Sequence, residues 1–267
     1  MVAAILAVAL LLLPLAGLVE RAPWRRLPEL LTSDSALTAL RLSLVVSVAA
    51  TVLVTIFGFP LAWVLARSEL RGQRLIRSLV LLPMVLPPVV GGTALLFALG
   101  RRGFVGSILD DWFGVTLLGT TTAAVLAATF VAMPFFVTTV EAALREANRD
   151  IEEAAATLGA TPSFIMRRIT LPQVKESMAV GLALAWARAL GEFGATITFA
   201  GNRAGQTRTL PLEIFLALES DPDAAIALSL VLVAVSLGVL LISRNRCLLY
   251  TSPSPRDATL SRMPSSA

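Results

Sequence analysis

The sequence has no histidine, a single cysteine and little charge. Without histidine, a histidine-based metal site or general base is excluded. Cys247 has no second cysteine to pair with, so no intrachain disulfide can form. Charged residues make up 15% of the chain, whereas a soluble domain carries about 25%. We therefore expect no large soluble domain, and no metal or cofactor held by this chain.

Long apolar runs are what the chain has instead. Hydrophobic residues make up 56% of it, and the mean hydropathy is +0.80. A membrane-spanning helix needs about 20 mainly apolar residues. Six runs qualify, at residues 2–19, 38–66, 75–99, 117–140, 177–200 and 223–243. They are too long for barrel strands, so we predict an all-α fold, a polytopic transmembrane helical bundle of about six spans.

The first run is interpreted as a span and not as a signal peptide, because no basic segment precedes it and it is long enough to cross. Whether the natural start of the chain is missing stays open. The net charge of +4 does not indicate nucleic-acid binding, because the arginines lie in short loops between apolar runs. Eleven basic residues lie on one side against seven on the other, or eight with Arg41. This bias predicts that both termini are cytoplasmic.

Prolines interrupt the third run at Pro83, Pro87 and Pro88. Proline removes a backbone donor and clashes with the preceding turn, so we expect this helix to kink or break. The break either opens a cavity or is a packing kink covered by neighbouring helices, and both interpretations stay open. Before the sixth run, Asp221 followed by Pro222 is typical of a helix start.

Residues 1–243 are predicted to form one transmembrane domain, and residues 244–267 do not belong with it. The latter segment contains the only cysteine and the only tyrosine of the chain and is rich in serine and proline. It resembles translated adapter sequence at the ends of some metagenomic reading frames. The alternative is an ordinary disordered tail. We expect no function from it in either case.

One loop between the fourth and fifth runs carries a spaced pattern. Its seven positions are Glu153, Ala154, Ala155, Gly159, Ile169, Leu171 and Pro172. We expect a short helix at 151–158 with Asp150 as its N-cap, ended by Gly159 at positive φ. A second helical segment is expected to start at Thr161 and Pro162. Small alanines allow another protein surface to approach closely, although the loop could also be an ordinary amphipathic surface segment.

The fifth run contains two charges four residues apart, Arg188 and Glu192. They share one helix face, and each would cost about 2.5–3.5 kcal/mol alone at the bilayer centre. We therefore expect them to pair with each other or to face a protein-lined cavity. They either border a translocation path, where Arg188 offsets the charge of an anion, or form a structural ion pair. The neighbouring Gly191 and Gly194 favour close helix packing.

The seven-position pattern resembles the cytoplasmic loop of permeases from ATP-binding cassette (ABC) importers. The segment 189–195, which includes Phe193 and Gly194, resembles molybdate-importer permeases, as do 200–202, 207–212 and 81–88. Sulfate permeases share the plan but commonly differ in the two residues after Gly-Glu. The resemblance covers residues 38–243. It implies a type I importer subunit in the bacterial inner membrane, in which the loop meets an ATPase.

The same resemblance implies partners. They are a second copy of the chain, two separate ATP-binding subunits and an extracytoplasmic oxyanion-binding protein, within membrane lipid. The chain itself cannot supply a Walker A site, because Lys175 is its only lysine and lacks the preceding glycines. We predict no catalytic residues and no enzyme activity. The alternatives are a sulfate or thiosulfate permease, and an ion-coupled secondary transporter, for which the sequence shows no clear repeat.

Overall fold

The computed structural model describes residues 1–248, and these are helical with no strand. The helices are α1 (Val2–Glu20), α2 (Leu27–Leu31), α3 (Asp34–Arg67), α4 (Gln73–Val85), α5 (Pro88–Leu99), α6 (Gly106–Phe113), α7 (Thr121–Glu146), α8 (Arg149–Thr157), α9 (Pro162–Ile165), α10 (Leu171–Leu190), α11 (Leu210–Ser220) and α12 (Pro222–Leu248), with π-helical turns η1 (Met166–Thr170) and η2 (Thr196–Ala200). The predicted all-α fold is confirmed. Helix α12 passes the predicted boundary at residue 243, and the rest of the predicted tail lies outside the described residues.

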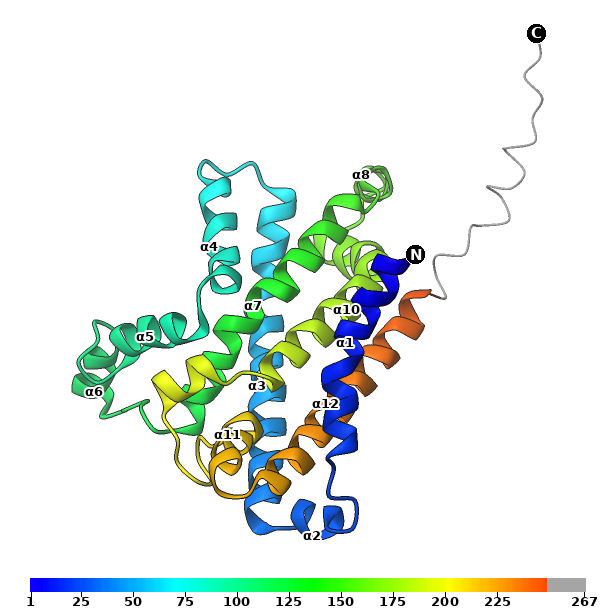
Figure 1. Ribbon diagram of the computed structural model, residues 1–267. Coiled ribbons are helices and arrows are strands. Elements are labelled where there is room, and N and C mark those ends of the chain that lie inside the picture. Colours follow the sequence, from blue (N-terminus) through cyan, green and yellow to red (C-terminus); the bar gives the residue numbers. More distant parts are fainter. Residues whose placement is uncertain (249–267) are drawn as a thin grey trace.

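Helices α3, α7 and α10 pack side by side and form the core of the bundle (Figure 1). The buried face of α7 is rich in alanine, including Ala124, Ala128 and Ala132, and α3 presents small residues opposite it. A Cβ added to Gly58 of α3 would lie 2.9 Å from the Phe136 ring. Small side chains thus bring the helices close enough for tight packing where no water drives association.

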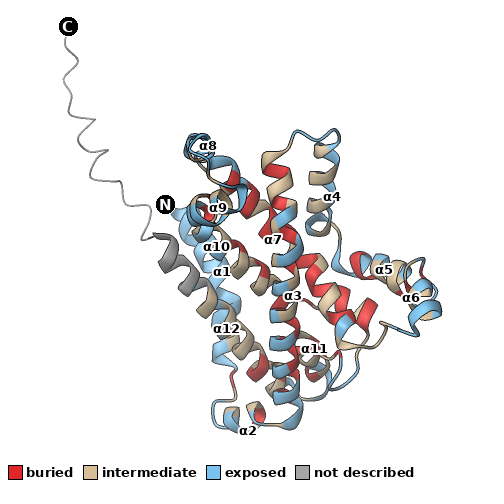
Figure 2. Ribbon diagram, turned by 180° about the vertical axis from the view of Figure 1, so that it is seen from behind, coloured by how far each residue is buried: buried red, intermediate tan, exposed pale blue. Residues whose placement is uncertain are grey.

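Helix α1 lies at the edge of the bundle and has no buried residue, as the pale blue ribbon in Figure 2 shows. Its surface is mainly leucine, alanine and valine, and it touches mainly α12. A helix that is apolar on every face suits a lipid environment. Helix α12 begins as predicted, because the Asp221 side chain accepts a hydrogen bond from the Ala224 amide at 3.2 Å.

Four helices in the described part are long and apolar enough to cross a membrane: α1, α3, α7 and α12. Helices α4 and α5 would make a fifth span, but they meet at an angle of 117°. The predicted break in the third run is therefore confirmed. Pro87 caps α5 in an extended conformation, and Pro88 is its first residue, so neither can continue the ladder of α4.

The fifth predicted span, 177–200, is not one continuous helix. Helix α10 begins earlier, at Leu171, and ends at Leu190, and the chain becomes helical again at Gly194, just before η2. The interruption covers residues 191–193, between Leu190 and the helical Gly194, and it begins at Gly191, where the intrinsic helix propensity is low. Two of the six apolar runs are thus broken helices, and sequence hydropathy alone does not reveal this.

The two ends of the bundle differ in what they carry. Figure 1 shows the N-terminus, α8 and the connection between α3 and α4 at one end. The short helices α2 and α11 lie at the opposite end. The loop that carries the spaced pattern is therefore at the same end as the N-terminus, as the predicted topology requires.

Candidate functional site

The spaced loop begins with α8 at the end of the bundle. The Asn148 side chain caps the helix by accepting a hydrogen bond from the Asp150 amide at 2.9 Å. The prediction of Asp150 as N-cap is therefore wrong, because Asn148 starts the helix two residues earlier. Asp150 lies in the first turn, where a negative charge still favours the helix N-terminus.

Gly159 ends the first segment with φ at +85°, as predicted. This left-handed conformation favours glycine because a side chain there would clash with the backbone. The Ala160 amide donates back to the Ala155 carbonyl at 3.0 Å, which closes the helix end. Thr161 then caps α9 through a 3.4 Å hydrogen bond from the Phe164 amide. The two predicted helical segments on either side of the glycine are confirmed.

Ile169, Leu171 and Pro172, the other positions of the pattern, lie farther along the chain. They belong to one continuous helical path from Pro162 through η1 into α10. The Leu171 amide donates to the Met166 carbonyl, five residues back. Pro172 has no amide hydrogen to donate, so the regular ladder is disturbed at this point and a π-helical turn accommodates it.

The tip of the loop is open to its surroundings. Glu153 and Ala154 are exposed, and the Glu153 side chain has no hydrogen bond or ion pair among the described residues. Leu158, just before the glycine, is 88% exposed. Ile151 and Phe164 are about half exposed. A charged and apolar surface of this kind, on a short rigid hairpin, is suited to contact with another protein.

Arg188, in the last turn of α10, and Glu192, in the break before η2, form an ion pair, one of the two arrangements expected from the sequence. Nη1 of Arg188 lies 2.7 Å from Oε2 of Glu192, without hydrogen-bond geometry. The Glu192 side chain is 1% exposed and that of Arg188 27% exposed. Oε1 of Glu192 accepts a hydrogen bond from the Ala195 amide at 2.7 Å. The carboxylate therefore fastens the broken segment to the end of α10.

The two broken runs meet at this point. A Cβ added to Gly194 would lie 2.7 Å from Cβ of Pro88, at the start of α5. One added to Gly92 would clash with Thr198 and the Ala195 backbone. Gly191, in contrast, makes no close approach outside its own helix. The predicted close packing therefore holds for Gly194 and is wrong for Gly191.

The aromatic neighbour of this break is Phe193. Its ring lies 5.2 Å from that of Phe215 in α11, at an interplanar angle of 51°. This packing joins the broken fifth run to α11.

Sequence reasoning missed a polar cluster at the loop end of the bundle. Oε1 of Glu152 accepts a hydrogen bond from Nη2 of Arg67 and another from Oγ1 of Thr170, both at 2.8 Å. Glu141 of α7 forms a second centre, with ion pairs to Arg77 and Arg145. The signal in the sequence was weak, since it consists only of acidic residues near the ends of apolar runs that also carry arginine.

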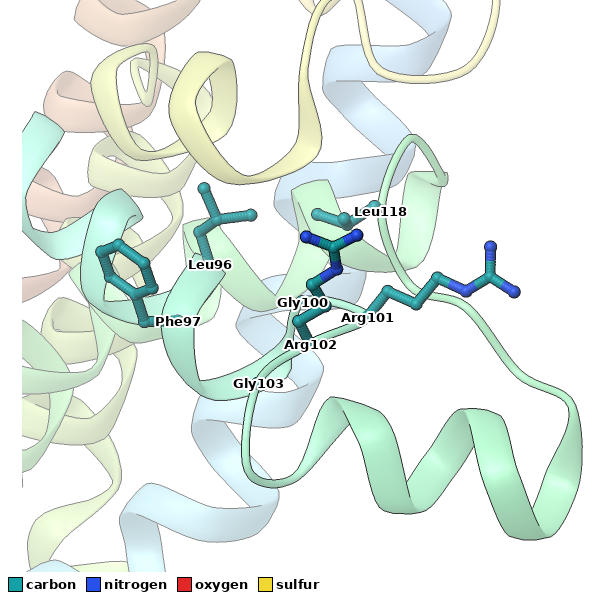
Figure 3. Close-up of a pocket in the computed structure, with 7 residues that line it drawn as sticks. All are labelled: Leu96, Phe97, Gly100, Arg101, Arg102, Gly103 and Leu118. Atoms are coloured by element: carbon teal, nitrogen blue, oxygen red, sulfur yellow. The ribbon is translucent and has the colours of Figure 1, made fainter.

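A cavity of about 310 Å³ lies at the other end of α5, beside the turn that leads to α6 (Figure 3). Its lining is Leu96, Phe97, Gly100, Arg101, Arg102, Gly103 and Leu118. Arg101 donates to Asp110 at 2.8 Å, and this hydrogen bond holds the pKa of the Asp110 carboxyl below its usual range. None of the predicted site residues lines this cavity.

The described residues contain no group of histidine, cysteine or acidic side chains placed to hold a metal ion. Long apolar helices, a broken pair of runs and an exposed helical loop together define a multi-pass helical membrane protein. Residues 58–246 match the family described as the binding-protein-dependent transport system inner membrane component. The chain belongs to this family of membrane transport components.

Individual relatives refine the comparison. The chain is 50% identical over 238 residues to the molybdenum transport system permease protein ModB of Mycobacterium tuberculosis, covering 89% of this chain and 90% of the relative. It is 37% identical over 240 residues to the sulfate transport system permease protein CysT of Salmonella typhimurium, covering 88% and 86%. The predicted resemblance to molybdate-importer permeases is confirmed.

A solved structure shows the same fold. A chain from a bacterial ABC transporter that imports the acidic polysaccharide alginate superposes with a TM-score of 0.71. The sequence identity is 22%, and the match covers 94% of this chain and 95% of the other. The fold is therefore that of an ABC-importer membrane component, as the sequence predicted.

Proposed function

We propose that the chain is the membrane-spanning subunit of an ATP-driven importer for molybdate or a similar tetrahedral oxyanion. The observation that carries the proposal is the 50% identity to a molybdenum permease over nine-tenths of both chains. The lower identity to a sulfate permease, 37%, makes sulfate or thiosulfate the second candidate. Hydrolysis of ATP belongs to a separate partner chain, because this one lacks the lysine and glycines of a Walker A loop.

The loop from α8 to Gly159 is the proposed contact with the ATPase. Its tip combines the free carboxylate of Glu153, the small Ala154 and the exposed Leu158. A short apolar projection flanked by charge fits a groove on a partner, and such buried apolar contacts dominate interface energy. The sharp turn at Gly159 keeps the projection compact. ATP binding would move this contact, and the bundle would alternate between inward-facing and outward-facing states.

Two copies of the chain, two ATPase subunits and an extracytoplasmic binding protein make up the proposed complex. The basic residues favour the end with α8 and the N-terminus as the cytoplasmic one, and the proposed topology has both termini in the cytoplasm. The binding protein would then meet the opposite end, and substrate choice would lie mainly in it. Helix α1, exposed along its length, suits contact with lipid.

Arg188 has a proposed double role at the helix break. Its ion pair with the buried Glu192 braces the broken segment. Its partial exposure, 27%, leaves the guanidinium accessible to an anion. Glu192, almost fully buried and held by the Ala195 amide, acts as the structural partner because a carboxylate repels an anionic substrate.

Reconstituted transport tests the proposal. The chain is assembled in liposomes with a candidate ATPase and a candidate oxyanion-binding protein from the same organism, and uptake of labelled molybdate is measured with and without ATP. We expect ATP-dependent uptake that excess tungstate reduces strongly and excess sulfate reduces little. If the complex takes up sulfate and excess molybdate does not reduce that uptake, the chain belongs to a sulfate importer, the second candidate. Uptake driven by an ion gradient without ATP would reject both.

A further inference from the structure

The exposed helix α8 is tied to the membrane bundle at very few points. It has no buried residue, and it packs mainly on the adjoining α9 and η1. Its tie to the long helix α3 consists of two side chains. Glu152 bonds Arg67, and Nη2 of Arg149 donates to the Ala66 carbonyl at 3.3 Å. Only Glu152 is both charge-paired and shielded, with 16% of its side chain exposed.

Glu152 reaches two different helices at once. Its Oε1 accepts from Arg67, the last residue of α3, and from Thr170, which is fully buried and directly precedes α10. Arg67 is itself held, because its guanidinium lies 5.6 Å from the centre of the Trp63 ring. A charge-assisted hydrogen bond of this kind is short, directional and stronger than a neutral one.

The end of α3 is also the meeting point of the neighbouring helices. The Leu65 carbonyl accepts hydrogen bonds from Gln73 and Arg77 of α4 and from Arg145 of α7. Positive charge at a helix C-terminus is favourable because the last carbonyls lack helical partners. A displacement of Arg67 therefore acts on a point that α3, α4 and α7 share.

We propose that Glu152 is the positioning residue through which movement of the α8 loop reaches the spans. It acts through Arg67 on α3 and through Thr170 on α10. The neighbouring Glu153 is exposed and has no such contact. In this proposal Glu152 passes movement on to the spans, and Glu153 contacts the partner protein. This inference rests on the proposed function, since it presumes a partner that moves the loop.

The first test measures coupling in the reconstituted complex. In Glu152→Ala, we expect molybdate uptake per ATP hydrolysed to fall about tenfold, while ATP hydrolysis stays within about twofold of the wild type. The matched control is Asp223→Ala, which removes an ion pair of 2.7 Å with Arg26 at the opposite end and should leave the ratio unchanged. The exchange Glu152→Arg with Arg67→Glu should restore much of the ratio.

A merely structural role gives a different pattern. Uptake and ATP hydrolysis would then both fall in proportion to the amount of assembled complex. The ratio of uptake to ATP hydrolysis would stay the same in Glu152→Ala and in the charge exchange. If Glu152→Ala does not assemble, Glu152→Gln keeps an acceptor for both donors and is measured instead. Loss of assembly in both variants, or a normal uptake ratio in Glu152→Ala, would overturn the inference.

A second test does not depend on the cargo. Spin labels at the exposed positions Glu69, just after α3, and Ala156 in α8 report the distance between the two helices, with Cys247 replaced by serine. In the complex with the ATPase, we expect the same distance with and without ATP, and an ATP-dependent change once Glu152→Ala is added. Equal behaviour of both proteins would reject the inference. A complex that imports no oxyanion, yet shows the expected label distances, would reject the proposed substrate alone.

Discussion

Removal of Arg188 should destabilise the protein more than removal of the whole ion pair. In Arg188→Ala, the carboxylate of Glu192, which is 1% exposed in the structure, loses its charged partner and keeps only the Ala195 amide. Breaking a buried pair on one side costs about 3–5 kcal/mol. Because Arg188 is 27% exposed, water screens part of the interaction, and we expect about 2–4 kcal/mol.

A second substitution, at Glu192, decides how much of the lost stability is recovered. Glu192→Ala removes the orphaned charge but leaves the amide of the fully buried Ala195 without an acceptor, at about 1–3 kcal/mol. Glu192→Gln removes the charge and keeps an oxygen for that amide. The order of stability should therefore be wild type first, then Arg188→Ala with Glu192→Gln, then Arg188→Ala with Glu192→Ala, with Arg188→Ala alone last.

Thermal unfolding in detergent, followed by loss of the monodisperse peak, measures this order. At about 2–4 °C per kcal/mol for a chain of this size, Arg188→Ala should lower the midpoint by about 4–16 °C. Losses that add independently across the pair would refute the coupling of the two side chains. Molybdate uptake is measured on the same samples. Normal uptake by a well-assembled double variant would reject a direct contact between Arg188 and the anion.

Other changes test the loop, the packing, the far end and the tail. Gly159→Val forces a branched side chain to positive φ, at about 1–2 kcal/mol, and should abolish uptake while the bundle stays assembled; normal transport would show that this turn is not part of the coupling element. Gly194→Ala should cost about 1–3 kcal/mol by overpacking against α5, which thermal unfolding measures, and an unchanged midpoint would show that the two broken runs separate freely. The hydrogen bond from Arg101 holds the pKa of Asp110 low, so the contact between Arg101 and Asp110 is present above the usual carboxyl range and is lost as pH falls through the lowered pKa. Protease cleavage of the turn should rise at that acid pH, and Asp110→Asn should remove this dependence of cleavage on pH. Deletion of residues 247–267 should leave insertion and transport unchanged, and loss of assembly would contradict the interpretation of the tail.

The sequence predicted the parts of the site that depend on local chemistry. Gly159 and Thr161 act on their own neighbours in the chain, so their turn and cap follow from residue type. The pair of Arg188 and Glu192 is likewise four residues apart. The contact of Glu152 with Arg67 joins residues 85 positions apart, and no spacing rule foresees it.

The broken runs were only partly predictable, for a related reason. The prolines in the third run predicted the bend between α4 and α5, where Pro87 and Pro88 lie. The break after Leu190 has only glycines, which helices in membranes commonly contain. What fixes that break is tertiary packing, because Gly194 must approach Pro88 and Glu192 must reach the Ala195 amide. Apolar composition predicted the number of runs, whereas tertiary contacts between the runs determine which of them form a continuous helix.

The uninterrupted helical path from Pro162 to Leu190 has a mechanical consequence. At 1.5 Å per residue it is about 43 Å long, with the loop at one end and the Arg188 turn at the other, so under the proposed function it would act as a lever. A tilt of about 5° about one end displaces the other by about 4 Å, more than the rise of two residues. Gating of this size needs no unfolding at either end. The π-helical turn η1 lies near the loop end of this path, so under the proposed function its stiffness would decide how much of a movement at the loop reaches the Arg188 end.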